Sequence, residues 1–275
     1  MNKFRMVLSF LVAAVILAGC ASSKHRSSSV VDYLYPNEKN YVEKQSIPHL
    51  NLPLRVGIAF VPEAAHSSMV LTETDKMDIM SKVSDNFKKY DFVKSIEVIP
   101  SAYLTRGGSF TNLEQVKNMY GVDVIALISF DQTQFTDQGS LSFTYWTIIG
   151  AYIIPAEKND THTMLDAVVY DIQSRKMLFR APGTHKIKSN STPINLTEQL
   201  REDSFLGFEE SQKKLIKNLE IQLELFKNKV KESPESYKIT KSQGYSGGGS
   251  IDSLFLFLLT LIGGYKLFQK RKGRA

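Results

Sequence analysis

Cysteine is nearly absent from this chain of 275 residues, in which Cys20 is the only one. A single cysteine cannot form an intrachain disulfide, so the fold cannot depend on a disulfide framework. The rest of the chain also has no thiol that could act as a nucleophile or as a metal ligand.

Motifs for metal binding and catalysis are missing as well. The histidines never stand three or four residues apart, which leaves a zinc site without support; they are His25, His49, His66, His162 and His185. There is no Gly-x-Ser-x-Gly elbow and no phosphate-binding loop. We therefore expect no metal, no cofactor and no enzymatic activity. The alternative is an enzyme whose pocket gathers two or more members of a scattered set: His66, His162, His185, Asp131 and Asp166.

An excess of positive charge is missing from the middle of the chain, although the whole sequence has a formal net charge of +6. Two basic residues precede residue 6, and five basic residues and one acid lie within residues 251–275. Residues 20–249 therefore carry 27 basic and 27 acidic side chains. Nucleic-acid binding needs a basic surface, so this neutral body argues against a nucleic-acid partner.

The first twenty residues have the pattern of an export signal. Two basic residues precede an apolar run at residues 6–17, which is too short to span a bilayer of about 30 Å. The sequence Leu-Ala-Gly-Cys follows, ending at Cys20, and it resembles the lipobox of bacterial lipoproteins. The resemblance implies a signal peptide at 1–19, cleavage between Gly19 and Cys20 by lipoprotein-processing enzymes, and acylation of Cys20. Membrane lipid would then be a partner, with the body outside the cytoplasm.

The last thirty residues combine a glycine-rich segment, an apolar run and a basic end. Residues 251–268 are predominantly apolar over about 27 Å of helix, which is enough for a single transmembrane helix. The basic residues that follow favour the cytoplasmic side. Each glycine disfavours a helix by about 1 kcal/mol relative to alanine, so the segment before the apolar run is expected to stay extended, as a protease requires. This segment consists of Gly247, Gly248, Gly249 and Ser250.

Glycines, an apolar helix and a basic cluster in this order resemble the GlyGly-CTERM sorting signal. That signal is processed by rhombosortase, a rhomboid-type intramembrane serine protease. Together with the lipobox, the whole chain resembles the rhombotarget lipoproteins. The resemblance implies that the protease removes the tail at 250–275 and that the body then belongs to the outer membrane or cell surface. The simpler alternative is a permanent single-span anchor.

Between these ends, hydrophobic periodicity predicts one α/β domain at residues 53–231. Strands are predicted at 54–62, 92–99 and 122–130, followed by a hairpin at 163–180. Helices are predicted after Thr72, from Thr111 to Met119, and after Asn195; Thr111 and Asn195 each precede a glutamate by three residues, as in a capping box. This order predicts a mixed β-sheet sandwich packed by helices. Its pattern over 54–182 loosely resembles the lipoproteins of curli-secretion-type channels.

Three stretches leave alternatives open. Residues 20–52 and 232–249 are polar and predict a tether and a Gly/Ser-rich linker, although Tyr33, Tyr35 and Tyr41 could dock on the domain. Residues 141–154 are rich in aromatic and branched side chains, and they fit either a strand pair in the core or an exposed apolar loop.

The predicted function is that of a non-catalytic cell-envelope lipoprotein whose α/β domain serves binding or assembly. The alternative is a subunit of an oligomeric secretion or pore assembly, in which residues 141–154 would contact the membrane or other copies. In that case the chain would form a homo-oligomer.

Overall fold

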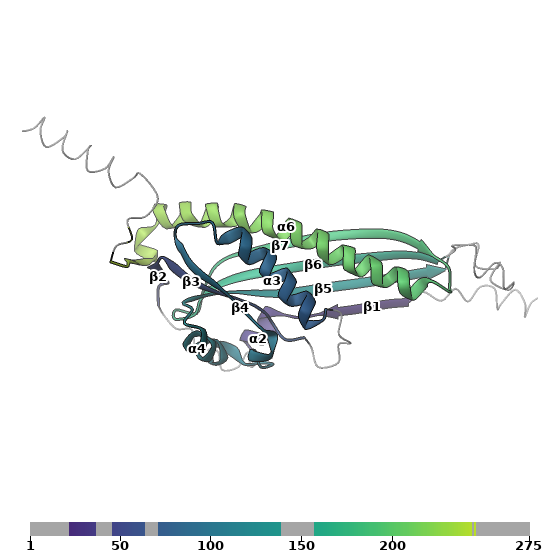
Figure 1. Ribbon diagram of the computed structural model, residues 1–275, viewed down its shortest axis with the longest axis horizontal. Coiled ribbons are helices and arrows are strands. Elements are labelled where there is room, and N and C mark those ends of the chain that lie inside the picture. The colour runs from purple at the N-terminus through teal and green to yellow at the C-terminus, as the bar shows by residue number, and fades with distance from the viewer. Residues whose placement is uncertain (1–21, 37–45, 64–70, 139–156, 244, 246–275) are drawn as a thin grey trace, which may run out of the picture.

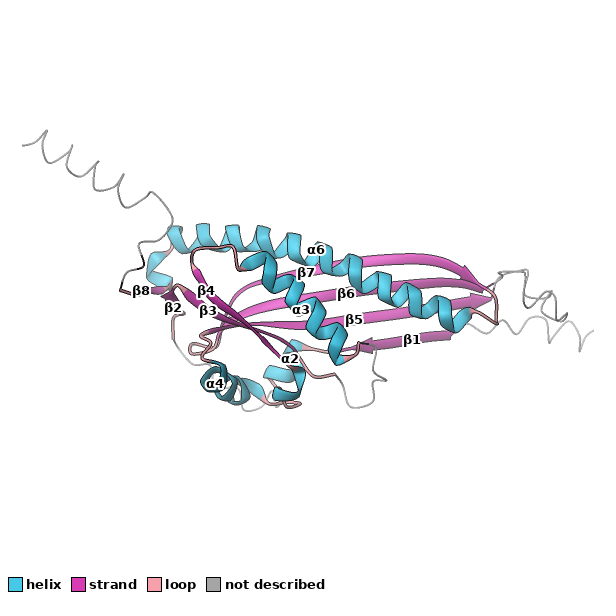
Figure 2. Ribbon diagram, viewed as in Figure 1, coloured by secondary structure: helices cyan, strands magenta, loops and turns pink. Residues whose placement is uncertain are grey.

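The computed structural model describes residues 22–36, 46–63, 71–138, 157–243 and 245. It confirms a mixed α/β fold built on a mixed sheet (Figures 1 and 2). Several predicted features lie outside the described residues: the predicted processing site at Gly19 and Cys20, the glycine segment 247–250, the predicted transmembrane helix at 250–275 and the apolar stretch 141–154. Among the residues that are described, no helix has both the length and the apolar character needed to cross a membrane.

The main sheet has the strand order β4-β3-β5-β6-β7, and β1 pairs with β5 beyond the end of β3. Three strands are parallel to one another, namely β3 (Leu54–Phe60), β4 (Val93–Ile99) and β5 (Val124–Gln138). The other three pair antiparallel with their neighbours, and they are β1 (Ser22–Ser27), β6 (Glu157–Asp171) and β7 (Lys176–Ser191). A second, two-stranded sheet is formed by β2 (His49–Leu52) and β8 (Lys238–Lys241).

Helices cover both faces of the parallel part of the sheet. Helices α3 (Glu73–Phe87) and α6 (Leu196–Glu232) pack on one face, where Phe60 and Phe130 are fully buried. Helices α2 (Val30–Leu34) and α4 (Ser109–Tyr120) pack on the other face. Coverage of both faces explains why the start of β5 reads as an almost continuous apolar run.

The helix boundaries follow the predicted signals in part. Thr72 forms a capping box with the residue three positions on, at the start of α3. The predicted capping box at Thr111 is wrong: α4 begins at Ser109 without a side-chain cap, because the glycine pair before it turns the chain earlier. Gly121 ends α4 in the left-handed conformation (φ +66°), as predicted. Asn195 precedes α6 as predicted, but its side chain makes no capping bond to the helix.

The predicted hairpin is confirmed, but its strands are far longer than predicted. β6 and β7 contain 15 and 16 residues, and β5 contains 15, so the three strands extend about 50 Å. We call residues 131–138, 157–164 and 184–191 the distal half of these strands. Figure 1 shows α6, a single helix of 37 residues, lying along their length.

The distal half is covered by α6 through polar side chains. Gln132 Nε2 donates to Thr163 Oγ1 at 2.8 Å, and Gln134 Nε2 donates to the carbonyl of Leu200 in α6 at 2.6 Å. Thr136 and Asn159 are buried in the same layer, at 6 % and 3 % exposure. Since inward and outward positions are both polar here, the alternation that marks a half-buried strand is missing from the sequence.

Two glycines bring α6 close to the sheet. A Cβ atom on Gly183 in β7 would overlap the Ser211 carbonyl oxygen and lie 2.5 Å from the Leu215 nitrogen, both backbone atoms of α6. A Cβ atom on Gly207 in α6 would overlap Thr163 Oγ1. At Gly183 the strand lacks a side chain where the helix backbone approaches it, and at Gly207 the helix lacks a side chain where the strand approaches it.

The amino-terminal part of the described chain differs from the predicted tether. Residues 22–27 form β1, and α2 buries Val30, Tyr33 and Leu34 against the core. The Tyr33 hydroxyl donates to Asn112 Oδ1 at 2.8 Å, and burial raises its pKa well above the usual range. Docking of Tyr33, the alternative left open by the sequence, is therefore what the structure shows. Within the predicted linker at 232–249, β8 pairs with β2.

We predict that Leu34→Ala lowers the free energy of unfolding by about 2–5 kcal/mol, because it empties a buried leucine site in the α2–α4 layer. Val31→Ala is the matched control, since Val31 lies in the same helix and is 62 % exposed. Urea unfolding of the folded chain measures both. Equal stability of the two variants would show that α2 does not belong to the core.

A second prediction concerns the approach of α6 to β7. Gly183→Ala forces a methyl group against helix backbone, which cannot rotate away, so we expect a loss of about 1–3 kcal/mol or more. Lys188→Ala, at an exposed position of the same strand, is the control. Thermal unfolding of both variants measures the difference, and a Gly183→Ala variant as stable as the control would contradict the close contact between α6 and β7.

Candidate apolar binding site

The described titratable side chains singled out by the sequence are spread over the main sheet, and each of the two aspartates pairs with a basic side chain of a neighbouring strand. His162 and His185 occupy adjacent register positions of β6 and β7, so they lie on opposite faces of the sheet. Asp131 lies 2.9 Å from a histidine of β1, and Asp166 lies 2.8 Å from an arginine of β7. His66 falls outside the described residues. In the described ranges, no three His, Cys, Asp or Glu side chains are grouped so that they could hold a metal ion.

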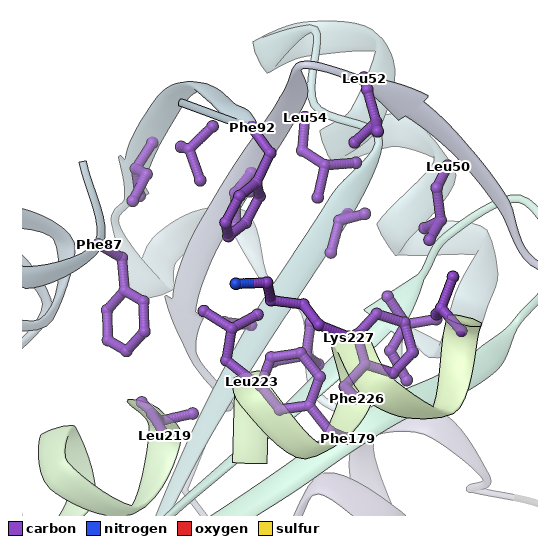
Figure 3. Close-up of a pocket in the computed structure, with 18 of the residues that line it drawn as sticks. Leu50, Leu52, Leu54, Phe87, Phe92, Phe179, Leu219, Leu223, Phe226 and Lys227 are labelled. Carbon is purple, nitrogen blue, oxygen red and sulfur yellow. The ribbon is translucent and has the colours of Figure 1, made fainter. Parts of the chain in front are cut away.

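The feature that stands out instead is a cavity of about 350 Å³ between α3, α6 and the sheet, which we call the α3–α6 cavity (Figure 3). Its floor comes from β3, β4, β5, β6 and β7, and residues of β2 and β8 also line it. Of the 23 residues that line it, 20 are apolar. A volume of this size falls at the lower end of the range of about 300–1,000 Å³ that is usual for small-molecule sites.

The cavity exists because α3 and α6 leave part of the sheet face uncovered. Val56 and Ala126 lie on the interior strands β3 and β5 but are only half-buried, and so is Ile96 on the edge strand β4. Further along β3, beneath the helices, Ile58 is 2 % exposed and Phe60 is fully buried. Half-buried apolar residues in the middle of a sheet mark a surface that α3 and α6 fail to cover.

Aromatic side chains form much of the wall. Phe87 ends α3, Phe92 leads into β4, and Phe179 and Phe226 face each other from β7 and α6 with ring centroids 5.5 Å apart. Phe226 also packs edge-on against Tyr237, at a centroid distance of 5.6 Å. These contacts hold the α6 wall at a fixed distance from the sheet.

Among the described residues that line the cavity, three are polar: Ser84, Lys227 and Lys231. Ser84 is 1 % exposed, and its hydroxyl has no hydrogen-bond partner among the described residues. Lys227 Nζ lies 2.9 Å from Glu224 Oε1 and 5.7 Å from the ring centroid of Phe92. Figure 3 shows the Lys227 side chain reaching across the space between α6 and Phe92. Its stem is apolar, so only the ammonium group adds charge to this space.

An ion pair ties the two helical walls together. Lys89, just after α3, lies 2.9 Å from Glu220 of α6. The hydrogen bond to Glu220 raises the pKa of the Lys89 ammonium, as expected for a cation paired with a carboxylate. Both groups are exposed, so the pair contributes little stability but restricts the separation of the helices at this end of the cavity.

Sequence reasoning found the residues of this site but not the site. Val83 and Phe87 of α3, and Leu219, Leu223 and Phe226 of α6, follow one another at the three- and four-residue spacing of an apolar helix stripe. A stripe predicts burial, and it gives the same signal whether protein or ligand covers it. The angle between two helices, which opens the cavity, has no counterpart in the periodicity of either one.

No protein-family model matches the sequence, and no curated protein sequence matches it. The function therefore has to be inferred from the cavity and from the motifs at the two ends of the chain.

Proposed function

We propose that the α/β domain is a non-catalytic binding module that takes up an apolar small molecule in the α3–α6 cavity. The observation that carries the proposal is the lining, in which 20 of 23 residues are apolar around a volume of about 350 Å³. Exposure of apolar surface to water is unfavourable. An apolar ligand that covers this surface gains about 25 cal/mol of free energy for each Å² removed from water. The ion pair between α3 and α6 and the aromatic contacts support a cavity that exists before the ligand arrives.

The neutral fluorescent probe N-phenyl-1-naphthylamine tests this proposal. We expect it to bind the wild-type chain with increased fluorescence. Ala126→Phe places a ring on the floor of the cavity and should weaken binding about tenfold or more, through lost volume. Ala102→Phe, which adds the same ring at an exposed position, should leave binding unchanged. Failure of the wild type to bind, or equal binding by both variants with intact folds, would reject the proposal.

We also propose that the chain is a cell-envelope lipoprotein, lipidated at Cys20 and cut by a rhombosortase-type protease at Gly247, Gly248, Gly249 or Ser250. The support is the lipobox-like sequence, together with the order of glycines, apolar run and basic end. In this proposal the tail at 250–275 enters the membrane as a single helix before cleavage.

The described fold gives the two motifs different attachment points. β1 begins at Ser22, two residues after Cys20, and Ser22 pairs with Thr136 near the distal end of β5. β8 ends at Lys241, which pairs with Leu52 at the opposite end of the molecule (Figure 1). The 37 residues of α6 connect these ends over about 55 Å. Lipid on Cys20 would therefore hold the molecule by its distal end, and the α3–α6 cavity lies toward the other end.

Intact-mass analysis of the mature protein from its native envelope tests the processing proposal. We expect a mass that lacks residues 1–19 and the tail and that includes acyl groups. Cys20→Ser should lose the acyl mass, and replacement of all three glycines by leucine should keep the tail. An unacylated wild type would refute lipidation, and an uncut wild type would indicate a permanent anchor.

A further inference from the structure

We propose that the ligand of the α3–α6 cavity is a single-chain fatty-acid anion, with its hydrocarbon chain in the cavity and its carboxylate at Lys227 and Lys231. This inference rests on the proposed binding function and adds the chemical class of the ligand. It is carried by three features of the cavity, namely its volume, the scarcity of polar groups in its lining, and the sign of the charge at its rim.

The volume is too small to enclose a helix. A helix of 18 residues, the length of the apolar run at 251–268, is about 27 Å long and about 10 Å wide, or on the order of 2,000 Å³. The cavity holds about 350 Å³. The chain's own apolar run therefore cannot fill it as a helix, nor can a helix of similar length from another protein.

The lining excludes an extended peptide. Every peptide unit carries a donor and an acceptor that need partners once they leave water. Among the lining residues, Ser84 is the only one with an uncharged polar side chain. An unbranched hydrocarbon chain needs no partners and is narrow enough for the space, so an acyl chain suits the cavity.

The charge at the rim favours an anion. Lys227 and Lys231 stand four residues apart on α6, which places them on one face of the helix with their Cβ atoms about 6 Å apart. No aspartate or glutamate is among the 23 lining residues. The carboxyl end of a helix carries partial negative charge, so attraction for an anion must come from the two ammonium groups.

The ammonium of Lys227 is placed to meet a carboxylate at the cavity. It lies 5.7 Å from the ring centroid of Phe92, and its carboxylate partner, Glu224, is not among the lining residues. Glu224 has an exposed side chain (56 %), so water can solvate it when a ligand carboxylate competes for Lys227. Ser84 alone is a poor site for the head group, because one hydroxyl cannot offset the desolvation of a buried carboxylate.

Displacement of N-phenyl-1-naphthylamine from the full chain tests the inference with three ligands of equal chain length: dodecanoate, 1-dodecanol and dodecyltrimethylammonium. In the wild type we expect dodecanoate to bind about tenfold more tightly than dodecanol, the gain expected from two partly exposed ion pairs. The cationic amphiphile should bind more weakly than dodecanol. In Lys227→Met/Lys231→Met, the preference for dodecanoate should fall to about twofold or less, with dodecanol binding unchanged.

The matched control is Lys213→Met/Lys217→Met, which makes the same change of charge at the same spacing on α6, away from the cavity, and should keep the preference. Ser84→Ala should keep it as well. Equal binding of dodecanoate and dodecanol by the wild type would overturn the inference. So would a preference that survives in the cavity variant or that disappears in Ser84→Ala. If the neutral probe does not bind the wild type at all, the binding function itself fails, which is a separate result.

Discussion

The packing of α6 against β5, β6 and β7 is the contact on which the rest of the structure depends. These three strands extend well beyond the parallel part of the sheet, where α3 and α4 supply the cover. Without α6, the inner face of the distal half would be open to water, and the cavity would lose one wall. The contact is close where Gly183 and Gly207 remove a side chain, so the helix backbone approaches the strands directly. Such proximity gives many dispersion contacts over a short length.

Hydrogen bonds specify the distal half of this contact. Gln132, Gln134 and Asn159 each bond within the buried layer or to the helix backbone. A shift of one residue along a strand would turn these side chains outward and bury their charged neighbours. A hydrophobic layer tolerates a slip better than a layer of amides, since each unpaired buried amide loses its hydration without compensation. The polar layer therefore fixes the register of three long strands that have little apolar alternation.

The sequence predicted the parts of the fold that bury apolar side chains with a regular period. β3, β4, the start of β5, the hairpin turn and the helix after Thr72 follow this pattern. It could not predict the distal half, where Gln, Thr and Asn take the buried positions, and it left the docking of Tyr33 open because the residues around Tyr33 are polar. Candidate catalytic groups such as Asp131 and Asp166 are found in local pairs. The cavity depends on how two elements diverge in space, and a one-dimensional pattern holds no information about that.

The position of the cavity follows from the sizes of the side chains along α6. In the first half of the helix, Gly207 and the backbone near Ser211 and Leu215 lie against the strands. In the second half, Phe226 meets Phe179 across 5.5 Å, so two rings separate the helix from the sheet. A straight helix that is close to the sheet at one end and held away at the other must leave a wedge of space. Hydrogen bonds fix the first half of α6 against the strands, so the α3–α6 cavity at the second half is preorganised. A ligand that binds there loses no free energy to ordering of the site.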